Sequence, residues 1–317
     1  MSRTLQLGAQ VGQQNMTMDE MRALWRKFDQ GGMEWLSAWD HLYEAPPADG
    51  TVPHFEAIAC LGAMAAETTN ARLGCFVFYV GYRNPGLLAK AAVTIDHISG
   101  GRFEIGLGAG WHKWEAEAFG YDFPSLGTRF DMLEEATPLI RSFFTNERTT
   151  HDGEHYKAVR AAINPPPVRG DIPIWIGGVG EKRTLKLVAE QADGWNAAYI
   201  SADEYKRLGG VLDRWCDKLG RDPATVERSI NLMFNLGVDE AAAKRSEASM
   251  ANDWGPMWPR VSQGALSGTP EQAIEQIIAY REAGADLINI AIRMPVETDA
   301  LDAYLEETVP AVRAAAG

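Results

Sequence analysis

The sequence is short of cysteine, of positive charge and of long hydrophobic runs. Its three cysteines, Cys60, Cys75 and Cys216, lie far apart without metal-ligand spacing, so we expect reduced thiols in a cytoplasmic protein. No stretch is long and apolar enough to span a membrane, and the N-terminal residues lack an apolar core of signal-peptide length. Neither a membrane protein nor a disulfide-stabilised secreted domain is therefore expected.

The shortage of positive charge limits the partners that the chain can attract. It has 30 Lys and Arg against 43 Asp and Glu, which gives a formal net charge of -13. This excludes binding to nucleic acid or to an anionic membrane through bulk charge, but leaves room for a local basic pocket that holds an acidic ligand. We predict no metal site, because the six histidines form neither an HExxH motif nor a Cys/His ligand pattern.

Hydrophobic residues make up 46% of the 317 residues, enough for one large core, and no linker splits the chain. We therefore expect one domain spanning 1–317. Eight short apolar runs typical of buried strands alternate with helical patterns; they lie at 4–11, 34–39, 72–79, 103–107, 173–176, 194–198, 229–236 and 286–292. The prediction is an α/β fold, a single (β/α)8 barrel with insertions at the C-terminal face of the strands. A doubly wound open sheet is the alternative, and it accounts less well for eight strands and a closing helix.

Three segments do not fit the alternation of strands and helices. Residues 114–127 are too aromatic and too rich in Gly and Pro for a regular element, and we expect an insertion on the active face. Residues 151–168 predict an excursion with one turn and one short strand. Residues 239–263 are polar and predict a partly helical, mobile segment that carries Trp254 and Trp258 near its end.

The stretch from Arg83 to Trp111 carries the clearest sequence of structural signals in the chain. It predicts a helix opened by Asn84-Pro85 and ended by Gly100-Gly101, and then a buried strand. Gly108-Ala109-Gly110 follows that strand at its C-terminal end, which is where ligands bind in parallel α/β proteins.

A second glycine cluster, Gly177-Gly178-Val179-Gly180, also follows a strand and leads into a helix. A helix N-terminus favours an anion, and Lys182 and Arg183 are close in sequence. Either cluster alone is also compatible with an ordinary turn. Two clusters at equivalent strand ends favour a site for a cofactor phosphate.

Trp39-Asp40-His41 follows the second predicted strand and places an acid and an imidazole at the same edge. Imidazole titrates near neutral pH, so His41 is a candidate for proton donation or uptake. A loop histidine held by a hydrogen bond is the commoner outcome for an isolated Asp-His pair. The strand at 72–79 is bulky and aromatic, which is typical of core, and Tyr79 at its end is the residue that we expect to face a ligand.

In this order and spacing, the motifs resemble those of the bacterial luciferase-like flavin and deazaflavin superfamily, and within it the coenzyme F420-dependent oxidoreductases. The resemblance runs from about residue 34 to 292. It is carried by Trp39-Asp40-His41, Tyr82-Arg83-Asn84-Pro85, Ile98-Ser99-Gly100-Gly101-Arg102, Gly106-Leu107-Gly108-Ala109-Gly110-Trp111, Pro173-Ile174-Trp175-Ile176-Gly177-Gly178, Ala192-Asp193-Gly194-Trp195-Asn196 and Gly268-Thr269-Pro270-Glu271.

This resemblance implies a (β/α)8 barrel that holds its cofactor at the strand C-termini. It also implies a non-prolyl cis peptide and a bulge near Phe76-Val77, behind the cofactor ring. By analogy His41 and Asp40 are the catalytic residues, with His41 as acid or base. The implied cofactor-binding residues are Asp40, Phe76, Val77, Tyr79, Ala109, Gly110, Gly177, Gly178, Val179 and Gly180.

The sequence departs from the F420-dependent sugar-phosphate dehydrogenases after Gly110, where they carry a catalytic Glu and this chain has Trp111. An indole cannot take a proton from a sugar hydroxyl. We therefore expect reduction of an imine, an enone, a nitroaromatic or a similar acceptor. Trp39, Trp111 and Trp114 are candidates for an apolar substrate pocket, although burial in the core is the commoner fate of a tryptophan.

Three hypotheses about function follow. The first is an F420-dependent oxidoreductase that transfers a hydride between reduced deazaflavin and a small organic substrate. The second is an FMN-dependent luciferase-like monooxygenase that uses reduced flavin and O2, and the third is a barrel that binds a flavin without turnover. The resemblance implies a homodimer whose partners are small molecules, with no nucleic acid and no membrane.

Overall fold

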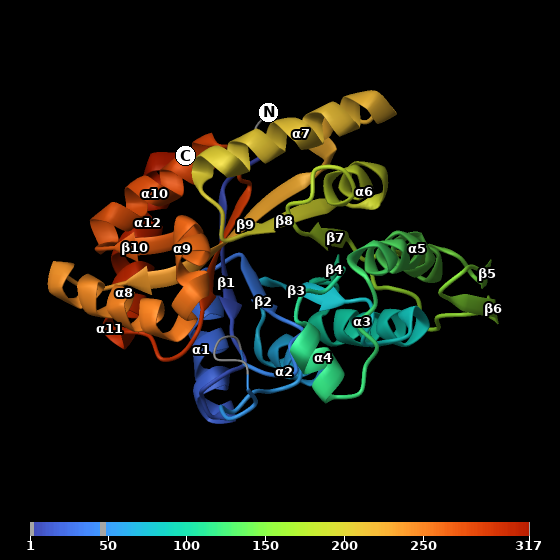
Figure 1. Cartoon of the computed structure of the whole chain (residues 1–317), viewed down its shortest axis with the longest axis horizontal. Helices are drawn as coiled ribbons and strands as arrows, with labels where there is room; N and C mark the ends of the chain where they lie inside the picture. The colour runs from blue at the N-terminus through green and yellow to red at the C-terminus, as the bar shows by residue number, and fades with distance from the viewer. Residues whose placement is uncertain (1–2, 45–48, 317) are drawn as a thin grey trace.

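In the computed structural model, which describes residues 3–44 and 49–316, eight parallel strands close into a barrel (Figure 1). Parallel pairing of β11 with β1 and of β8 with β9 completes the circle. The (β/α)8 prediction is confirmed and the open sheet is excluded. In order around the barrel the strands are β1 (Gln6–Val11), β2 (Trp35–Ala38), β3 (Arg72–Tyr79), β4 (Phe103–Gly108), β7 (Ile174–Gly177), β8 (Gly194–Ala198), β9 (Glu227–Leu236) and β11 (Leu287–Ile292).

Helices surround the barrel and cover the outward faces of its strands (Figure 1). They are α1 (Met18–Gln30), α2 (Ala57–Glu67), α3 (Pro85–Ser99), α4 (Lys113–Ala118), α5 (Leu126–Thr145), α6 (Thr184–Gln191), α7 (Ala202–Leu219), α8 (Glu240–Trp254), α9 (Trp258–Val261), α10 (Pro270–Glu282), α11 (Thr298–Ala303) and α12 (Val309–Ala316). The cap signals act as expected: Asn84 caps α3, and Gly100 ends it at φ 68°.

The alternation of side chains along each strand gives the molecule two apolar regions. Outward residues such as Leu7 and Ile105 join the large core between the barrel and its helices. Inside the barrel a smaller cluster is formed by Trp35, Phe76 and Trp175 with Leu287. Trp35 stacks on Phe76 with ring centroids 4.7 Å apart. These large rings fill the middle of the barrel, so ligands can enter only at its ends.

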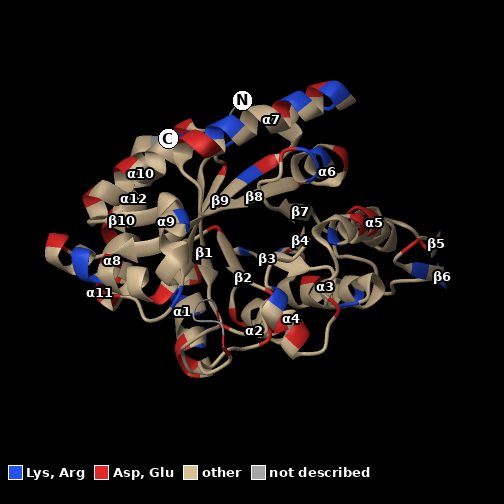
Figure 2. Cartoon of the chain, in the orientation of Figure 1, with Lys and Arg blue, Asp and Glu red and all other residues tan. Residues whose placement is uncertain are grey.

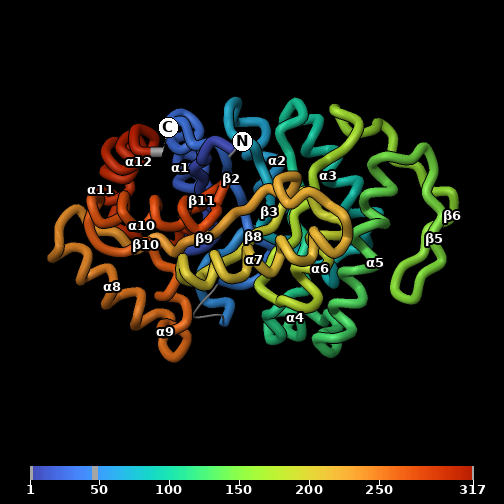
Figure 3. The backbone as a smooth tube through the Cα atoms, turned by 90° about the horizontal axis from the view of Figure 1, so that it is seen from above, coloured from blue at the N-terminus to red at the C-terminus, as the bar shows by residue number. Residues whose placement is uncertain are grey.

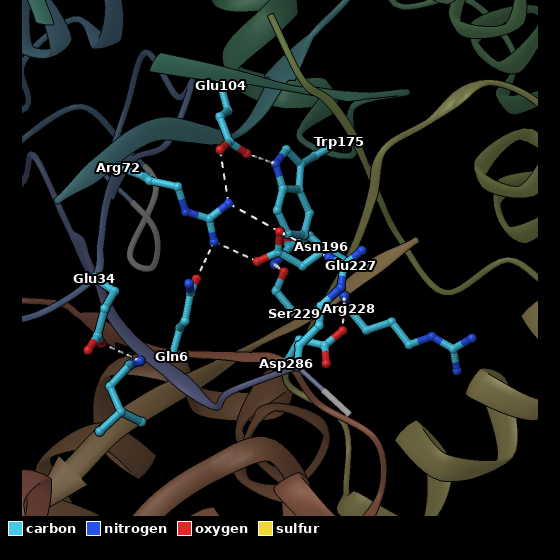
Figure 4. Close-up of polar contacts among 12 residues, drawn as sticks. Gln6, Glu34, Arg72, Glu104, Trp175, Asn196, Glu227, Arg228, Ser229 and Asp286 are labelled. Carbon is cyan, nitrogen blue, oxygen red and sulfur yellow. Dashed lines mark hydrogen bonds and ion pairs between the residues drawn. The ribbon is translucent and has the colours of Figure 1, made fainter. Parts of the chain in front are cut away.

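At the N-terminal end of the strands, Arg72 and its polar partners form the barrel floor (Figure 4). Arg72 Nη1 donates to Glu104 at 2.9 Å and lies 3.1 Å from Glu227. Its other amino group contacts Gln6 and Glu227. The Trp175 indole N–H donates to the second oxygen of Glu104 at 2.6 Å. Two carboxylates thus neutralise one guanidinium and close this end.

Three insertions differ from expectation. Residues 113–118 form α4 where we expected no regular element, because the His112 side chain accepts the Glu115 N–H and starts a helical turn. The excursion holds two antiparallel strands, β5 (Thr149–Asp152) and β6 (Lys157–Ala161), rather than one. A short strand, β10 (Ala265–Gly268), was also missed; it pairs with the far end of β9.

These insertions lie around the barrel rather than inside it. Figure 3 shows α4 and α9 on the side of the barrel opposite the chain termini, and the β5–β6 hairpin at the end of the molecule away from α8. Figure 2 shows acidic and basic residues along the outer helices, with both signs on α7. Among the residues described, no helix is long and apolar enough to cross a membrane.

Candidate active site

His41 lies at the C-terminal mouth of the barrel and is held by a carboxylate that the sequence analysis did not single out. His41 Nδ1 is 2.7 Å from Glu115 Oε1. The Tyr82 hydroxyl donates to the same oxygen at 2.9 Å. Glu115 Oε2 accepts the backbone N–H groups of Leu42 and Tyr43 at 3.0 and 3.1 Å. Glu115 from α4 therefore fixes both the His41 ring and the chain that carries it.

The charge state of Glu115 determines the tautomer of His41. Burial by itself raises the pKa of Glu115, but the hydrogen bonds from His41, Leu42 and Tyr82 outweigh it and lower the pKa to about 2. The group is thus a carboxylate at neutral pH and can only accept a hydrogen bond. His41 Nδ1 must then carry the hydrogen, which leaves Nε2 to exchange a proton with a ligand.

Asp40 pairs with Arg83 rather than with His41. Its side chain is 1% exposed, and Arg83 Nη1 donates to both carboxylate oxygens at 2.8 and 2.7 Å. The Tyr79 backbone N–H donates to it at 3.1 Å. Burial raises the pKa of Asp40, while Arg83 and Tyr79 oppose that shift. Asp40 fixes the end of β2 against β3; a direct contact with the cofactor remains a prediction.

The three predicted pocket tryptophans take different positions. Trp111 is 54% exposed and meets the His41 ring edge-on, with centroids 5.2 Å apart. Trp114 is half-exposed but packs on Tyr43, with centroids 5.4 Å apart. Trp39 is buried, and its indole N–H donates to His54 Nε2 at 3.0 Å. Trp111 thus has the most direct access to a ligand beside His41.

The predicted cis peptide between Phe76 and Val77 is present, and the pairing of β3 with β4 shifts register there. Phe76 points into the ring cluster inside the barrel, while its carbonyl accepts from Gln10 at 2.7 Å. Val77 points toward the glycines of β4 and β7: a Cβ at Gly108 or Gly177 would lie 2.5 or 2.7 Å from a Val77 methyl carbon. These glycines therefore make room for the bulge, a role that the sequence analysis did not assign to them.

The loop after β4 packs on Tyr79. A Cβ at Gly110, whose φ is +71°, would lie 2.5 Å from the Tyr79 ring, so only glycine fits here. The Ala109 carbonyl accepts from Arg129 Nε at 3.0 Å. The Tyr79 hydroxyl is buried without a hydrogen-bond partner among the described residues. Tyr79 thus packs on Gly110 at the edge of the core and is only 5% exposed, and its contact with a ligand stays a prediction.

The second glycine cluster precedes α6, whose N-terminus has no side-chain cap. Gly177 and Gly178 are half-buried, and Gly178 adopts a φ of 130°. The Arg183 side chain turns away to α5, where it pairs with Glu134 at 2.6 Å and Asp131 at 2.7 Å. The Gly178 N–H already donates to the Asn196 carbonyl at 3.0 Å. An anion beside this cluster would therefore be held by the other backbone N–H groups that lead into α6, rather than by Arg183.

Sequence reasoning missed Glu115 and Tyr82 as members of this site. Glu115 follows Trp111 by four residues, and an acid so close to the glycine loop was the available signal. The described residues contain no cluster of three or more His, Cys, Asp or Glu side chains arranged to hold a metal ion.

Residues 3–287 match the family model for luciferase-like monooxygenases. The chain belongs to this family. An uncharacterised protein of Mycobacterium tuberculosis is 34% identical over 162 residues, which cover 51% of this chain and 56% of that protein. An F420-dependent glucose-6-phosphate dehydrogenase of Nocardia farcinica is 26% identical over an alignment covering 91% of this chain and 92% of the relative.

Solved structures of other proteins share the fold. An F420-dependent secondary alcohol dehydrogenase, in complex with an F420-acetone adduct, superposes with a TM-score of 0.86 at 19% identity over 98% of this chain and 99% of that one. An EDTA monooxygenase from Chelativorans superposes with a TM-score of 0.83 at 15% identity over 99% and 94% of the two chains. Enzymes named for these two different chemistries thus share this fold.

Proposed function

We propose that this chain is an F420-dependent oxidoreductase, with reduction of a small electrophilic acceptor such as an imine, an enone or a nitroaromatic as its reaction. The observation that carries the proposal is the His41–Glu115 pair at the barrel mouth, against Trp111 of the loop after β4. The similarity to F420-dependent relatives over nine-tenths of the chain supports the choice of cofactor.

The residues at the mouth fit a flat cofactor with a phosphate-bearing tail. Val77 and the backbone of Gly177 border the position where the ring would lie, and the uncapped N-terminus of α6 offers N–H groups for the phosphate. Bound there, reduced F420 supplies a hydride from C5, and the redox chemistry belongs to the cofactor.

The protein's own part in the reaction is positioning and proton transfer. His41 Nε2 donates the proton that the acceptor takes up with the hydride, while Glu115 stabilises the imidazolium form and fixes the ring. Trp111 lies against His41 and provides an apolar surface for the acceptor instead of a second acid or base. This arrangement suits reduction of an unsaturated acceptor better than oxidation of a sugar hydroxyl.

An FMN-dependent monooxygenase is the second candidate, and the similarity in fold to the EDTA monooxygenase favours it. The two functions differ in their need for oxygen. A monooxygenase requires O2 to form product, whereas hydride transfer from reduced F420 to an acceptor proceeds without it.

The test is turnover of enone, imine and nitroaromatic panels with chemically reduced F420 or FMN, with and without O2. The proposal predicts anaerobic oxidation of reduced F420, and a loss of about 100-fold or more in His41→Ala. Product that forms only with FMN and O2 would contradict it. Two further proposals, a homodimer and a cytoplasmic location, rest on the family resemblance; light scattering of the purified protein and fractionation of the native cell test them.

A further inference from the structure

Arg293, directly after β11, lies among aromatic rings at the barrel mouth. Its guanidinium carbon is 4.3 Å from the Trp39 ring centroid, 5.0 Å from that of Trp254 and 5.9 Å from that of Tyr199. Only 8% of the residue is exposed. Trp39 adjoins the Asp40-His41 pair in sequence, and Trp254 ends α8, so Arg293 lies between the catalytic edge and the α8 insertion.

No carboxylate pairs with Arg293 anywhere in the described parts of the chain. Its hydrogen bonds within the described residues go to two neutral oxygens. Nη2 donates to the Tyr199 hydroxyl at 3.1 Å, and Nη1 donates to Gln14 Oε1 at the long distance of 3.5 Å. The buried Nε has no partner. A guanidinium carries five N–H donors, so several are left for a ligand.

Burying the Arg293 guanidinium without a carboxylate partner is energetically unfavourable unless another group balances its charge. A buried cation without a counter-ion is unfavourable, and stacking on aromatic rings recovers only part of the cost. Arg83, also at the mouth, pairs with both Asp40 and Glu56. Arg129 is as buried as Arg293 and also lacks a carboxylate partner, but its Nε and Nη1 donate to backbone carbonyls at 3.0 and 2.6 Å. Arg293 differs from both because it lacks a carboxylate and its buried Nε has no partner among the described residues.

The position of Arg293 separates it from the residues proposed for the cofactor. In the strand order around the barrel, β11 lies four strands from β4 in either direction, directly across the mouth. Asp40, which pairs with Arg83, follows β2, and the other proposed cofactor residues come from β3, β4 and β7 or the loops after them. The partners of Arg293 follow β1, β2 and β8. An anion at Arg293 would thus belong to the substrate rather than to the cofactor.

We propose that Arg293 binds the carboxylate of an organic acid substrate whose unsaturated part lies toward His41. The inference deepens the proposed function and rests on it. Nε and the Nη groups form the planar fork that matches a carboxylate, and the Trp39 and Trp254 rings suit the flat organic part of such an acid. One guanidinium balances one negative charge, which favours a carboxylate over a phosphate dianion.

The experiment is calorimetric titration of the F420-loaded protein with three probes: benzoate, the neutral isostere benzamide, and inorganic phosphate. We expect benzoate to bind more tightly than either of the others. Arg293→Gln should weaken benzoate binding by about tenfold or more and leave binding of benzamide unchanged. The matched control is Arg245→Gln on α8, which removes an arginine whose side chain is 65% exposed; it should bind benzoate like the wild type.

Equal benzoate affinity in wild type and Arg293→Gln, or no benzoate binding at all, would overturn the proposal, and so would tighter binding of phosphate than of benzoate. Arg293→Lys keeps the charge and removes the fork; we expect it to fold and to bind benzoate with intermediate affinity. F420 affinity, measured separately in each variant, distinguishes the two proposals: wild-type F420 affinity without benzoate binding rejects the acid substrate alone.

Discussion

Each end of the barrel holds an arginine, and the two arginines differ in how their charge is balanced by carboxylates. At the floor, the Arg72 side chain is 25% exposed and still pairs with two carboxylates, Glu104 and Glu227. At the mouth, Arg293 is only 8% exposed and has no carboxylate partner in the described chain. The better solvated cation has the more complete set of partners.

We infer from this difference that the floor of the barrel serves stability and the mouth serves ligand binding. At the floor, the charge of Arg72 is balanced by carboxylates within the protein, so this ion-pair cluster contributes to folding and needs no ligand. At the mouth, Arg293 Nε and the Tyr79 hydroxyl are buried without partners among the described residues. A substrate acid bound at Arg293 would satisfy its Nε, and without such a ligand this unpaired donor lowers folding stability.

The strongest test of this difference is to replace the arginine at each end of the barrel by glutamine and compare the loss of stability. Arg72→Gln leaves the buried Glu104 without a cation and leaves Glu227 with Arg3 alone, and it should lower the free energy of unfolding by about 3 kcal/mol. Arg293→Gln should change it by less than about 1 kcal/mol, because the lost cation–π stacking is offset by removal of an unpaired charge. Urea denaturation measures both, and equal losses would contradict the contrast.

A second test uses His54, which lies beside Trp39 at the mouth. Burial lowers the pKa of His54 to about 4, well below its usual 6.5. Between pH 6.5 and 4, His54 is protonated in the unfolded chain but stays neutral in the folded chain. The free energy of unfolding should therefore fall as the pH drops through this range, by at most about 3 kcal/mol. His54→Gln, whose side-chain oxygen can still accept from Trp39, should flatten this dependence. The exposed His97→Gln should keep the wild-type profile.

Glu115→Gln tests whether the carboxylate acts on His41 as a positioning residue. Turnover with reduced F420 should fall about 100-fold, and the pH profile of kcat should shift, because the amide no longer stabilises the imidazolium. F420 affinity should stay unchanged. Glu117→Gln, on the same helix but exposed, is the matched control; a loss of turnover as large in the control would point to disruption of α4 instead.

The smallest expected effect belongs to a surface pair. Arg245 and Glu297 approach to 3.6 Å with exposed side chains. Arg245→Gln should change the free energy of unfolding by less than about 0.5 kcal/mol. A larger loss in thermal or urea unfolding would show that α8 contributes more to stability than its exposed contacts indicate.

The sequence was sufficient to predict the barrel because its signals are local. The strands expected at 72–79 and 194–198 are β3 and β8, with those same bounds. The cis peptide at Phe76-Val77 followed from the family resemblance. Apolar runs, caps and glycine stops act within a few residues, so a single chain reveals them.

The site was predicted only in part because its contacts are distant in sequence. The position of His41 was found, but its partner Glu115 is 74 residues away, in a segment expected to be irregular. Likewise, no local pattern indicates that Arg293 would pack on Trp39 and Trp254. Such contacts depend on how insertions fold back over the mouth, which strand periodicity does not determine.

The most direct test of the central claim is an equilibrium titration of the cofactor-free protein with F420 and, separately, with FMN, followed by fluorescence quenching. The account predicts that F420 binds tightly and FMN weakly, and that Arg72→Gln at the floor alters stability without altering F420 affinity. Tight binding of FMN with weak binding of F420 would contradict the account and place the chain with the flavin monooxygenases.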